Sequence, residues 1–161
     1  MIGNGFVQHL KFLLVENNPT DQIAVERFFK GQKWSHDLDV ASSYRQALEL
    51  LSKNSYDIVL LDYSLGDGTG LELLSKIHDI PVIFISGSST EQIIIEAMKA
   101  GAYDFLIKDH NQNFLSLLPS TIEKVVKRKL AEDRLKKYLA ELERSNEELR
   151  SFAFVASHDL N

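Results

Sequence analysis

Cysteine is absent from the 161-residue sequence, which excludes both a disulfide framework and a cysteine-based metal site. No apolar run approaches the roughly 20 residues needed to cross a bilayer, and the N-terminus lacks the basic and then apolar pattern of a signal peptide. Basic residues are not in excess. The formal net charge of −5 argues against nonspecific binding to nucleic acid. These absences predict a cytoplasmic chain without a membrane segment, although a longer parent protein could contain one.

The composition is that of a globular protein, with 44% hydrophobic and 25% charged residues. The length suits one domain of ordinary size plus an extension. Residues 129–161 are much denser in charge than the rest, with acidic and basic side chains nearly balanced. We therefore predict a folded domain over 1–128 and a structurally different segment over 129–161.

Short apolar runs alternate with helical patterns along the first part of the chain. Runs without a polar break indicate strands that are buried on both faces. The alternation predicts an α/β fold, a doubly wound parallel sheet with right-handed crossovers and helices on both faces. The strands are expected at 11–15, 37–41, 57–61, 81–85 and 104–107, and the helices between them at 19–33, 43–53, 70–77 and 90–100.

Asp62 stands at the end of the central strand and is followed by a loop with three glycines within eight residues. Open α/β sheets bind their ligands at the carboxyl ends of the strands. Asp62 is therefore a candidate nucleophile of the kind that forms an aspartyl phosphate. The alternative is an ordinary loop or helix-capping aspartate without chemistry.

The other strand ends carry polar side chains of complementary chemistry, namely Glu16, Asn17, Ser86 and Lys108. Two carboxylates and an amide suit a hard cation such as Mg²⁺, and a hydroxyl with an ammonium suits the oxygens of a phosphoryl group. Each residue also has an ordinary explanation: turn residues before a proline, a turn cap, and a solvated lysine. Their coincidence at one sheet edge favours a phosphoryl site.

These residues resemble the receiver domain of two-component response regulators over about residues 10–128. The similarity rests on Glu16-Asn17, Asp62, Ser86-Gly87 and, most closely, the segment 100–108 with Phe105 and Lys108. The resemblance implies a flavodoxin-like (βα)5 sheet of order 2-1-3-4-5.

The resemblance also implies the roles of the site residues. A phosphohistidine donor protein would transfer its phosphoryl group to Asp62, assisted by Lys108 and Ser86. Mg²⁺ would be held by Glu16, Asn17, Asp62 and the backbone carbonyl of Ser64. Ser86 and Phe105 would move on phosphorylation, although Phe105 could equally be a plain core aromatic.

Two positions depart from the family pattern. Asn17 is neutral where the family usually has the second acid of a pair, which would weaken metal binding. Asp109 follows Lys108 where the family commonly has proline, so a cis peptide bond is not expected there.

Beyond Pro119 the apolar pattern changes to a seven-residue repeat. The repeat predicts a long helix that pairs with a second copy as a short parallel coiled coil, with Asn146 near the seam. A single solvated helix is the alternative, but it would leave its leucines bare. The repeat positions are Leu135, Leu142, Leu149 and Ala156.

The end of this helix, with Ser157-His158-Asp159-Leu160, resembles the start of the histidine-box helix of sensor histidine kinases. The resemblance implies that His158 is phosphorylated by an ATP-binding kinase domain elsewhere in the parent chain. We therefore expect the chain to be the N-terminal piece of a larger kinase. The alternative is an ordinary exposed helix histidine.

The preferred function is a phosphorelay receiver that regulates a dimeric histidine kinase module through the C-terminal helix. A second possibility keeps the fold as a non-phosphorylated dimerisation or docking module. An aspartate-nucleophile phosphatase fits less well because Ser64 stands where a second acid is wanted. A flavin protein would need a hydroxyl-rich and glycine-rich loop after the first strand.

Overall fold

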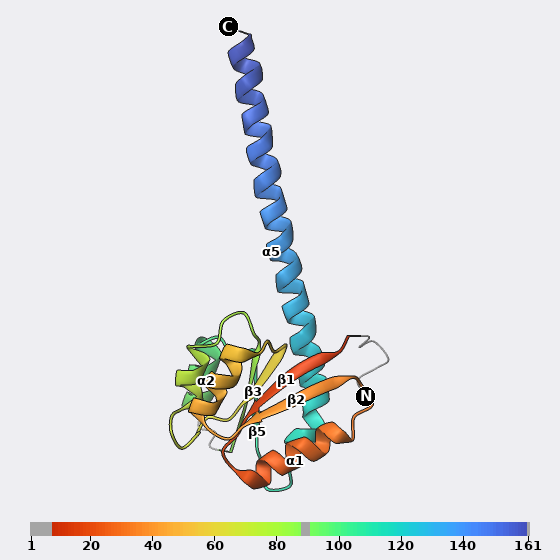
Figure 1. Ribbon diagram of the computed structural model, residues 1–161, viewed down its shortest axis with the longest axis vertical. Helices are drawn as coiled ribbons and strands as arrows, with labels where there is room; N and C mark the ends of the chain where they lie inside the picture. Colours follow the sequence, from red (N-terminus) through yellow and green to blue (C-terminus); the bar gives the residue numbers. More distant parts are fainter. Residues whose placement is uncertain (1–7, 88–90, 161) are drawn as a thin grey trace. The chain divides into compact units, whose positions relative to one another are not determined.

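A computed structural model describes residues 8–87 and 91–160 of the chain. Five parallel strands form one sheet in the order β2-β1-β3-β4-β5, which confirms the predicted doubly wound fold (Figure 1). The strands are β1 (Leu10–Val15), β2 (His36–Ala41), β3 (Ile58–Leu61), β4 (Val82–Ser86) and β5 (Asp104–Ile107). The helices are α1 (Pro19–Lys30), α2 (Tyr44–Lys53), α3 (Gly70–Leu74), α4 (Glu91–Lys99) and α5 (Phe114–Asp159).

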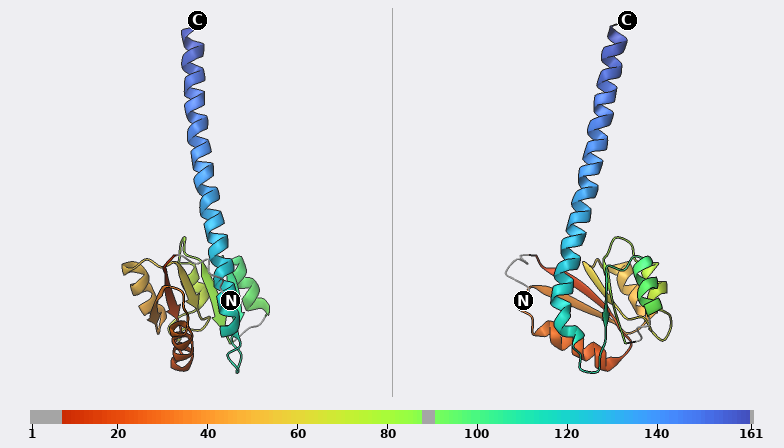
Figure 2. Two further views of the ribbon diagram at one scale, coloured as in Figure 1. Left: turned by 90° about the vertical axis from the view of Figure 1, so that its right-hand side faces the viewer. Right: turned by 180° about the vertical axis from the view of Figure 1, so that it is seen from behind.

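The strands bury side chains on both faces of the sheet, as continuous apolar runs require. On one face, Leu13 and Leu61 pack in a cluster with buried residues of α2, α3 and α4. On the other, Phe12 meets Phe29 of α1 edge to face at 4.9 Å between ring centroids. Figure 2 shows α1 and the first turns of α5 on this second side of the sheet.

Helix ends follow local capping chemistry. The side chain of Ser43 accepts a hydrogen bond from the Gln46 amide at the start of α2, as expected for a cap. Helix α1 ends at Lys30, three residues before the predicted end, and the Gly31 amide closes its last turn. Helix α3 ends at Leu74 and is also shorter than predicted. The predicted start of the next helix at Thr90 lies outside the described residues.

Helix α5 begins at Phe114, before Pro119 rather than beyond it. Proline is tolerated in the first helical turn but costs a backbone hydrogen bond further in, and here Pro119 lies in the second turn. Phe114 and Leu118, which both precede Pro119, are buried, and their burial accounts for the helix starting early.

The chain divides into two compact units, one up to Val125 and one from Val126 on, and α5 contributes to both. In the second unit every described residue from 133 onward is exposed, which includes the leucines of the seven-residue repeat. Among the described helices, none is both long enough and apolar enough to cross a membrane.

Candidate functional site

The ammonium group of Lys108 lies among three carboxylates at the carboxyl edge of the sheet. Its Nζ atom is 2.9 Å from an oxygen of Asp21 and 3.2 Å from an oxygen of Asp62, and it also pairs with Glu16. The side chains of Lys108, Glu16 and Asp62 are only 12%, 3% and 11% exposed. The structure thus brings together three of the predicted site residues and adds a fourth, Asp21.

Strand register explains this convergence. Val15 of β1 pairs with Leu61 of β3, so the next residues, Glu16 and Asp62, leave adjacent strands at the same height. The Asp62 amide donates to the Val15 carbonyl at 3.0 Å. On the other side of β4, the Lys108 amide donates to the Ser86 carbonyl at 3.0 Å, and the long lysine side chain reaches back to the acids.

Burial and ion pairing oppose each other in the carboxylate pocket, which Lys108, Glu16, Asp21 and Asp62 form. Burial raises the pKa of Glu16, although the hydrogen bond from Lys108 and that from the Asn18 amide oppose it. Burial lowers the pKa of Lys108, but the hydrogen bond to Glu16 and the nearby charge of Asp62 raise it by more. The pKa of Lys108 is therefore raised overall. Lys108 is therefore a fixed positive charge at neutral pH.

The loop after Asp62 is held from two sides. An added Cβ on Gly70 would collide with the Asp62 carbonyl oxygen and lie 2.8 Å from the Phe84 ring, so only glycine fits this close approach. Asp67 accepts hydrogen bonds from the Tyr44 and Arg45 amides at 2.7 and 3.1 Å. This carboxylate therefore ties the loop to the start of α2.

The remaining predicted residues of the sheet edge are placed as follows. Asn17 is exposed, and its amide nitrogen faces Gly66 of the loop after β3. Ser64 is exposed in that same loop, where its backbone forms an isolated antiparallel β-bridge with Thr69. Ser86 is buried at the end of β4. Phe105 is half-buried and stacks on Phe84, with the ring planes 4° apart and the centroids 6.1 Å apart.

Two further predictions concern residues after β5. The Lys108–Asp109 peptide bond is trans, as expected without proline. Asp109 instead accepts hydrogen bonds from the Asn113 amide at 2.6 Å and the Phe114 amide at 3.4 Å, where α5 starts. His158 lies in the second unit, near the end of α5, with its ring 6.3 Å from that of Phe154.

Asp21 is the site residue that sequence reasoning missed. It lies in the first turn of α1, where acidic residues commonly complement the helix dipole. That ordinary explanation leaves no local signal for a role at the sheet edge. The only usable hint is its position shortly after Glu16, in the helix that follows β1.

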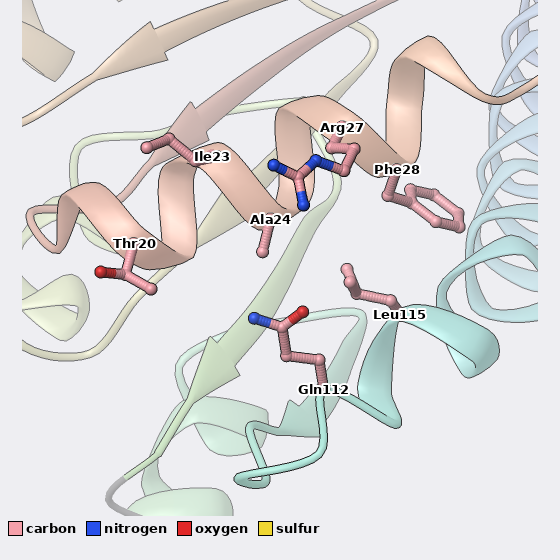
Figure 3. Close-up of a pocket in the computed structure, with 7 residues that line it drawn as sticks. All are labelled: Thr20, Ile23, Ala24, Arg27, Phe28, Gln112 and Leu115. Atoms are coloured by element: carbon pink, nitrogen blue, oxygen red, sulfur yellow. The ribbon is translucent and has the colours of Figure 1, made fainter.

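An open groove of about 430 Å³ runs between α1 and the turn that leads into α5 (Figure 3). Ile23 and Phe28 line the α1 side, and Gln112 and Leu115 line the other. Ile23 is 52% exposed. Thr20 lies at one end of the groove and directly precedes Asp21 in the sequence.

Comparison with protein families decides the relationship. The family model described as "Response regulator receiver domain" matches residues 12–118. The chain is a response regulator receiver. Receivers of two-component systems take up a phosphoryl group on an aspartate, and they generally bind Mg²⁺.

Individual relatives agree with this assignment. The receiver is 31% identical to the two-component response regulator ARR11 of Arabidopsis thaliana over 78% of this chain and 24% of the relative. It is 29% identical to the transcriptional regulatory protein ZraR of Escherichia coli over 73% of this chain and 26% of the relative. The chain thus matches about a quarter of the length of these relatives.

The fold is likewise similar to solved receiver structures. The Mn²⁺-bound form of response regulator Rcp1 superposes with a TM-score of 0.64 at 24% identity, covering 71% of this chain and 91% of that one. Within the described part of the chain, no three His, Asp or Glu side chains are arranged to hold a metal ion by themselves. Mg²⁺ commonly needs only one or two carboxylates besides water, so the oxygen donors of Glu16 and Asp62 fit it.

Proposed function

We propose that this receiver accepts a phosphoryl group on Asp62. The observation that carries the proposal is the convergence of Asp62, Glu16 and Lys108 within one ion-paired pocket at the carboxyl edge of the sheet. An oxygen of Asp62 attacks the phosphorus of a phosphohistidine, the new P–O bond forms, and the P–N bond to the donor breaks. The donor histidine keeps the electron pair of the broken bond.

Neighbouring side chains stabilise the charge that develops during the transfer. The Lys108 ammonium faces Asp62 and is positioned to contact a phosphoryl oxygen. Ser86, at the end of the adjacent strand, offers a hydroxyl to another. Glu16 and Asp62, with Asn17 and the backbone carbonyl of Ser64, would hold Mg²⁺. When bound, Mg²⁺ neutralises charge on the phosphoryl oxygens.

The test is incubation with acetyl phosphate and Mg²⁺, followed by intact-mass measurement. The wild-type chain should gain one acid-stable, base-labile phosphoryl group, and Asp62→Asn should gain none. Asp57→Asn, at another carboxylate outside the pocket, is the matched control and should be modified like the wild type. A wild-type chain that takes up no phosphoryl group, or an Asp62→Asn variant that still does, would contradict the proposal.

The groove between α1 and the start of α5 suits the phosphodonor protein. One of its lining residues, Thr20, directly precedes Asp21 in the first turn of α1, and Ile23 provides an exposed apolar contact in the groove. A donor that seats an apolar helix face in this groove would bring its phosphohistidine close to Asp62. This is the interaction that we assign to the donor.

We further propose that α5 connects the receiver to a dimeric histidine kinase module in the parent chain. The support is the row of exposed leucines, since Leu135, Leu142 and Leu149 are 59%, 65% and 64% exposed. A solvated helix gains nothing from such a row, whereas a homodimer buries it. His158 would then be the phosphoacceptor of the kinase, served by an ATP-binding domain of the parent protein.

Phosphorylation at Asp62 would bias this module through α5, in the cytoplasm where donor and receiver meet. The test is the kinase output of the parent protein with a phosphodonor present. Asp62→Asn should remove the response to the donor while leaving basal output in place. An unchanged response to the donor in this variant would contradict the proposed coupling between Asp62 and the kinase module.

One observation favours a different function on the same fold. Asn17 supplies no charge at the end of β1, and it is exposed rather than part of the ion-paired pocket. A receiver-like module that docks or dimerises without being phosphorylated would tolerate this residue. The acetyl phosphate experiment separates the two functions, because the docking module would stay unmodified.

A further inference from the structure

Lys108 has one more carboxylate partner than the strand ends supply. Glu16 and Asp62 follow β1 and β3, whereas Asp21 reaches the ammonium from the first turn of α1. The Asp21 contact, at 2.9 Å, is shorter than the 3.2 Å contact of Asp62. At 26% side-chain exposure, Asp21 is also the most exposed of the three acids, so it lies toward the mouth of the pocket.

The backbone fixes Asp21 in this place. The side chain of Asn18 caps α1 by accepting from the Thr20 amide at 2.9 Å, and Pro19 opens the helix. The side-chain amide of Gln22 donates to the Glu16 carbonyl oxygen at 2.5 Å. The first turn of α1 is therefore tied to the end of β1, and Asp21 sits between these two attachments.

The charge balance of the pocket depends on Asp21. With it, three carboxylates face one ammonium, and the net charge of −2 matches a divalent cation. Without it, Lys108 would cancel half of the charge of Glu16 and Asp62. The end of β1 offers no replacement, because Asn17 is an amide.

We propose that Asp21 is a positioning residue for the divalent-cation site. It holds the Lys108 ammonium and offsets its charge, so that Glu16 and Asp62 keep their full attraction for Mg²⁺. Asp21 acts through Lys108 rather than as a metal ligand. This inference rests on the proposed function, since it concerns the cation of the same site.

The experiment is calorimetric titration of the unphosphorylated full chain with MgCl2 and, separately, MnCl2. Removing an outer partner of a metal site commonly weakens binding by 10-fold or more, so Asp21→Asn should raise both dissociation constants by about 10-fold. In a Lys108→Met background, the further change Asp21→Asn should alter both dissociation constants less than about threefold, because the ammonium that Asp21 holds and offsets is gone. A purely structural role of Asp21 at the start of α1 would weaken binding by the same factor in both backgrounds.

Three outcomes overturn the inference. Asp21→Asn could bind both metals within twofold of the wild type, or it could weaken binding as much in the Lys108→Met background as in the wild type. In either case, a wild-type chain that binds Mg²⁺ and is modified by acetyl phosphate leaves the proposed function standing. A wild-type chain that does neither removes both the proposed function and the inference.

Discussion

Lys108 is the only cation that contacts the three acids of the pocket among the ion pairs of the described residues. Its side chain is largely buried, and so are those of Glu16 and Asp62. A buried charge that loses its partner is costly, because it can neither be paired nor return to water. The stability of the metal-free receiver therefore depends on this lysine.

Replacing Lys108 by alanine should lower the free energy of unfolding by about 3 kcal/mol at neutral pH. The loss should shrink toward about pH 5, because the unpaired carboxylates can take up protons and Glu16 already has a raised pKa. Urea denaturation without metal, followed by the fluorescence of the single tryptophan, Trp34, measures both values. An equal loss at both pH values would contradict the prediction.

Lys124→Ala is the matched control. Lys124 also pairs with a carboxylate, that of Asp104, at 3.0 Å, but its side chain is 74% exposed. Exposed ion pairs contribute little. This variant should therefore stay within about 1 kcal/mol of the wild type at both pH values.

The raised pKa of Tyr56 predicts a second pH dependence of the free energy of unfolding, at alkaline pH. Its pKa is raised above the ordinary 10.0, chiefly by burial and then by the hydrogen bond that its hydroxyl donates to Asp39 at 2.7 Å. The unfolded chain loses this proton first, so the contribution is fully present below pH 10.0 and is lost as the pH rises above it.

Tyr56→Phe should remove this part of the alkaline slope in a plot of unfolding free energy against pH. Asp39→Asn should reduce the slope without abolishing it, because the ring stays buried. Urea denaturation at a series of alkaline pH values measures the slopes. The assignment fails if Tyr56→Phe retains the wild-type slope.

Some site residues follow from sequence and others do not. Asp62 and Lys108 were predictable because each directly follows a strand, and the carboxyl ends of parallel strands lie at the same edge of the sheet. Asp21 was not, because its place depends on how α1 turns back over β1. That geometry is set by tertiary packing, and a first-turn acid has the same sequence signature with or without a partner.

At the scale of elements, the apolar runs located all five strands, while the helix boundaries were less predictable. Helix α1 ends at Lys30, directly before Gly31, and α3 ends at Leu74, although Ile77 continues its apolar pattern. Helix α5 starts before Pro119 because Phe114 and Leu118 are buried. Burial of particular side chains sets the start of α5, and sequence periodicity does not show which side chains become buried.

The start of α5 depends on Asp109, which accepts hydrogen bonds from amides that lack helical partners. Asp109→Ala should lower the free energy of unfolding by about 1 kcal/mol, the usual effect of losing a cap. Asp109→Asn keeps an acceptor oxygen and should lose less. Urea denaturation ranks the variants, and equal stability of the alanine and asparagine variants would argue against capping.

The groove between α1 and the start of α5 gives a prediction for phosphotransfer. Ile23→Lys should slow transfer from a phosphorylated donor protein about 10-fold or more, as expected for an apolar contact worth at least 1.4 kcal/mol. Modification by acetyl phosphate should be unchanged, because this small donor needs no docking surface. Radiolabelled phosphotransfer measures the first rate and intact mass the second.

Ile95→Lys makes the same change on α4, where Ile95 is 45% exposed. It should transfer at the wild-type rate if the donor uses the groove. Equal slowing in both variants would remove the groove as the docking surface.

At the scale of the whole molecule, the exposed leucines of α5 predict a homodimer. Leu142→Glu should convert a dimer into a single chain, because a charge at the seam must be desolvated on pairing. Arg144→Gln makes the net charge more negative by the same amount on an 80% exposed side chain and should remain dimeric. Sedimentation equilibrium gives both masses, and a wild-type chain that stays single at every concentration would refute the pairing.

A practical rule for shortening the protein follows from α5. Phe114, Leu118, Ile122 and Val125 are buried, so the first three turns of this helix belong to the interior of the receiver. A deletion from the C-terminus that stops after Val125 removes residues whose side chains, over the described range 126–160, are all exposed or half-buried. A deletion that removes one more helical turn would also take away the buried side chains of Ile122 and Val125 and leave a cavity beside the sheet. Fragments for crystallisation or proteolysis mapping should therefore end beyond Val125.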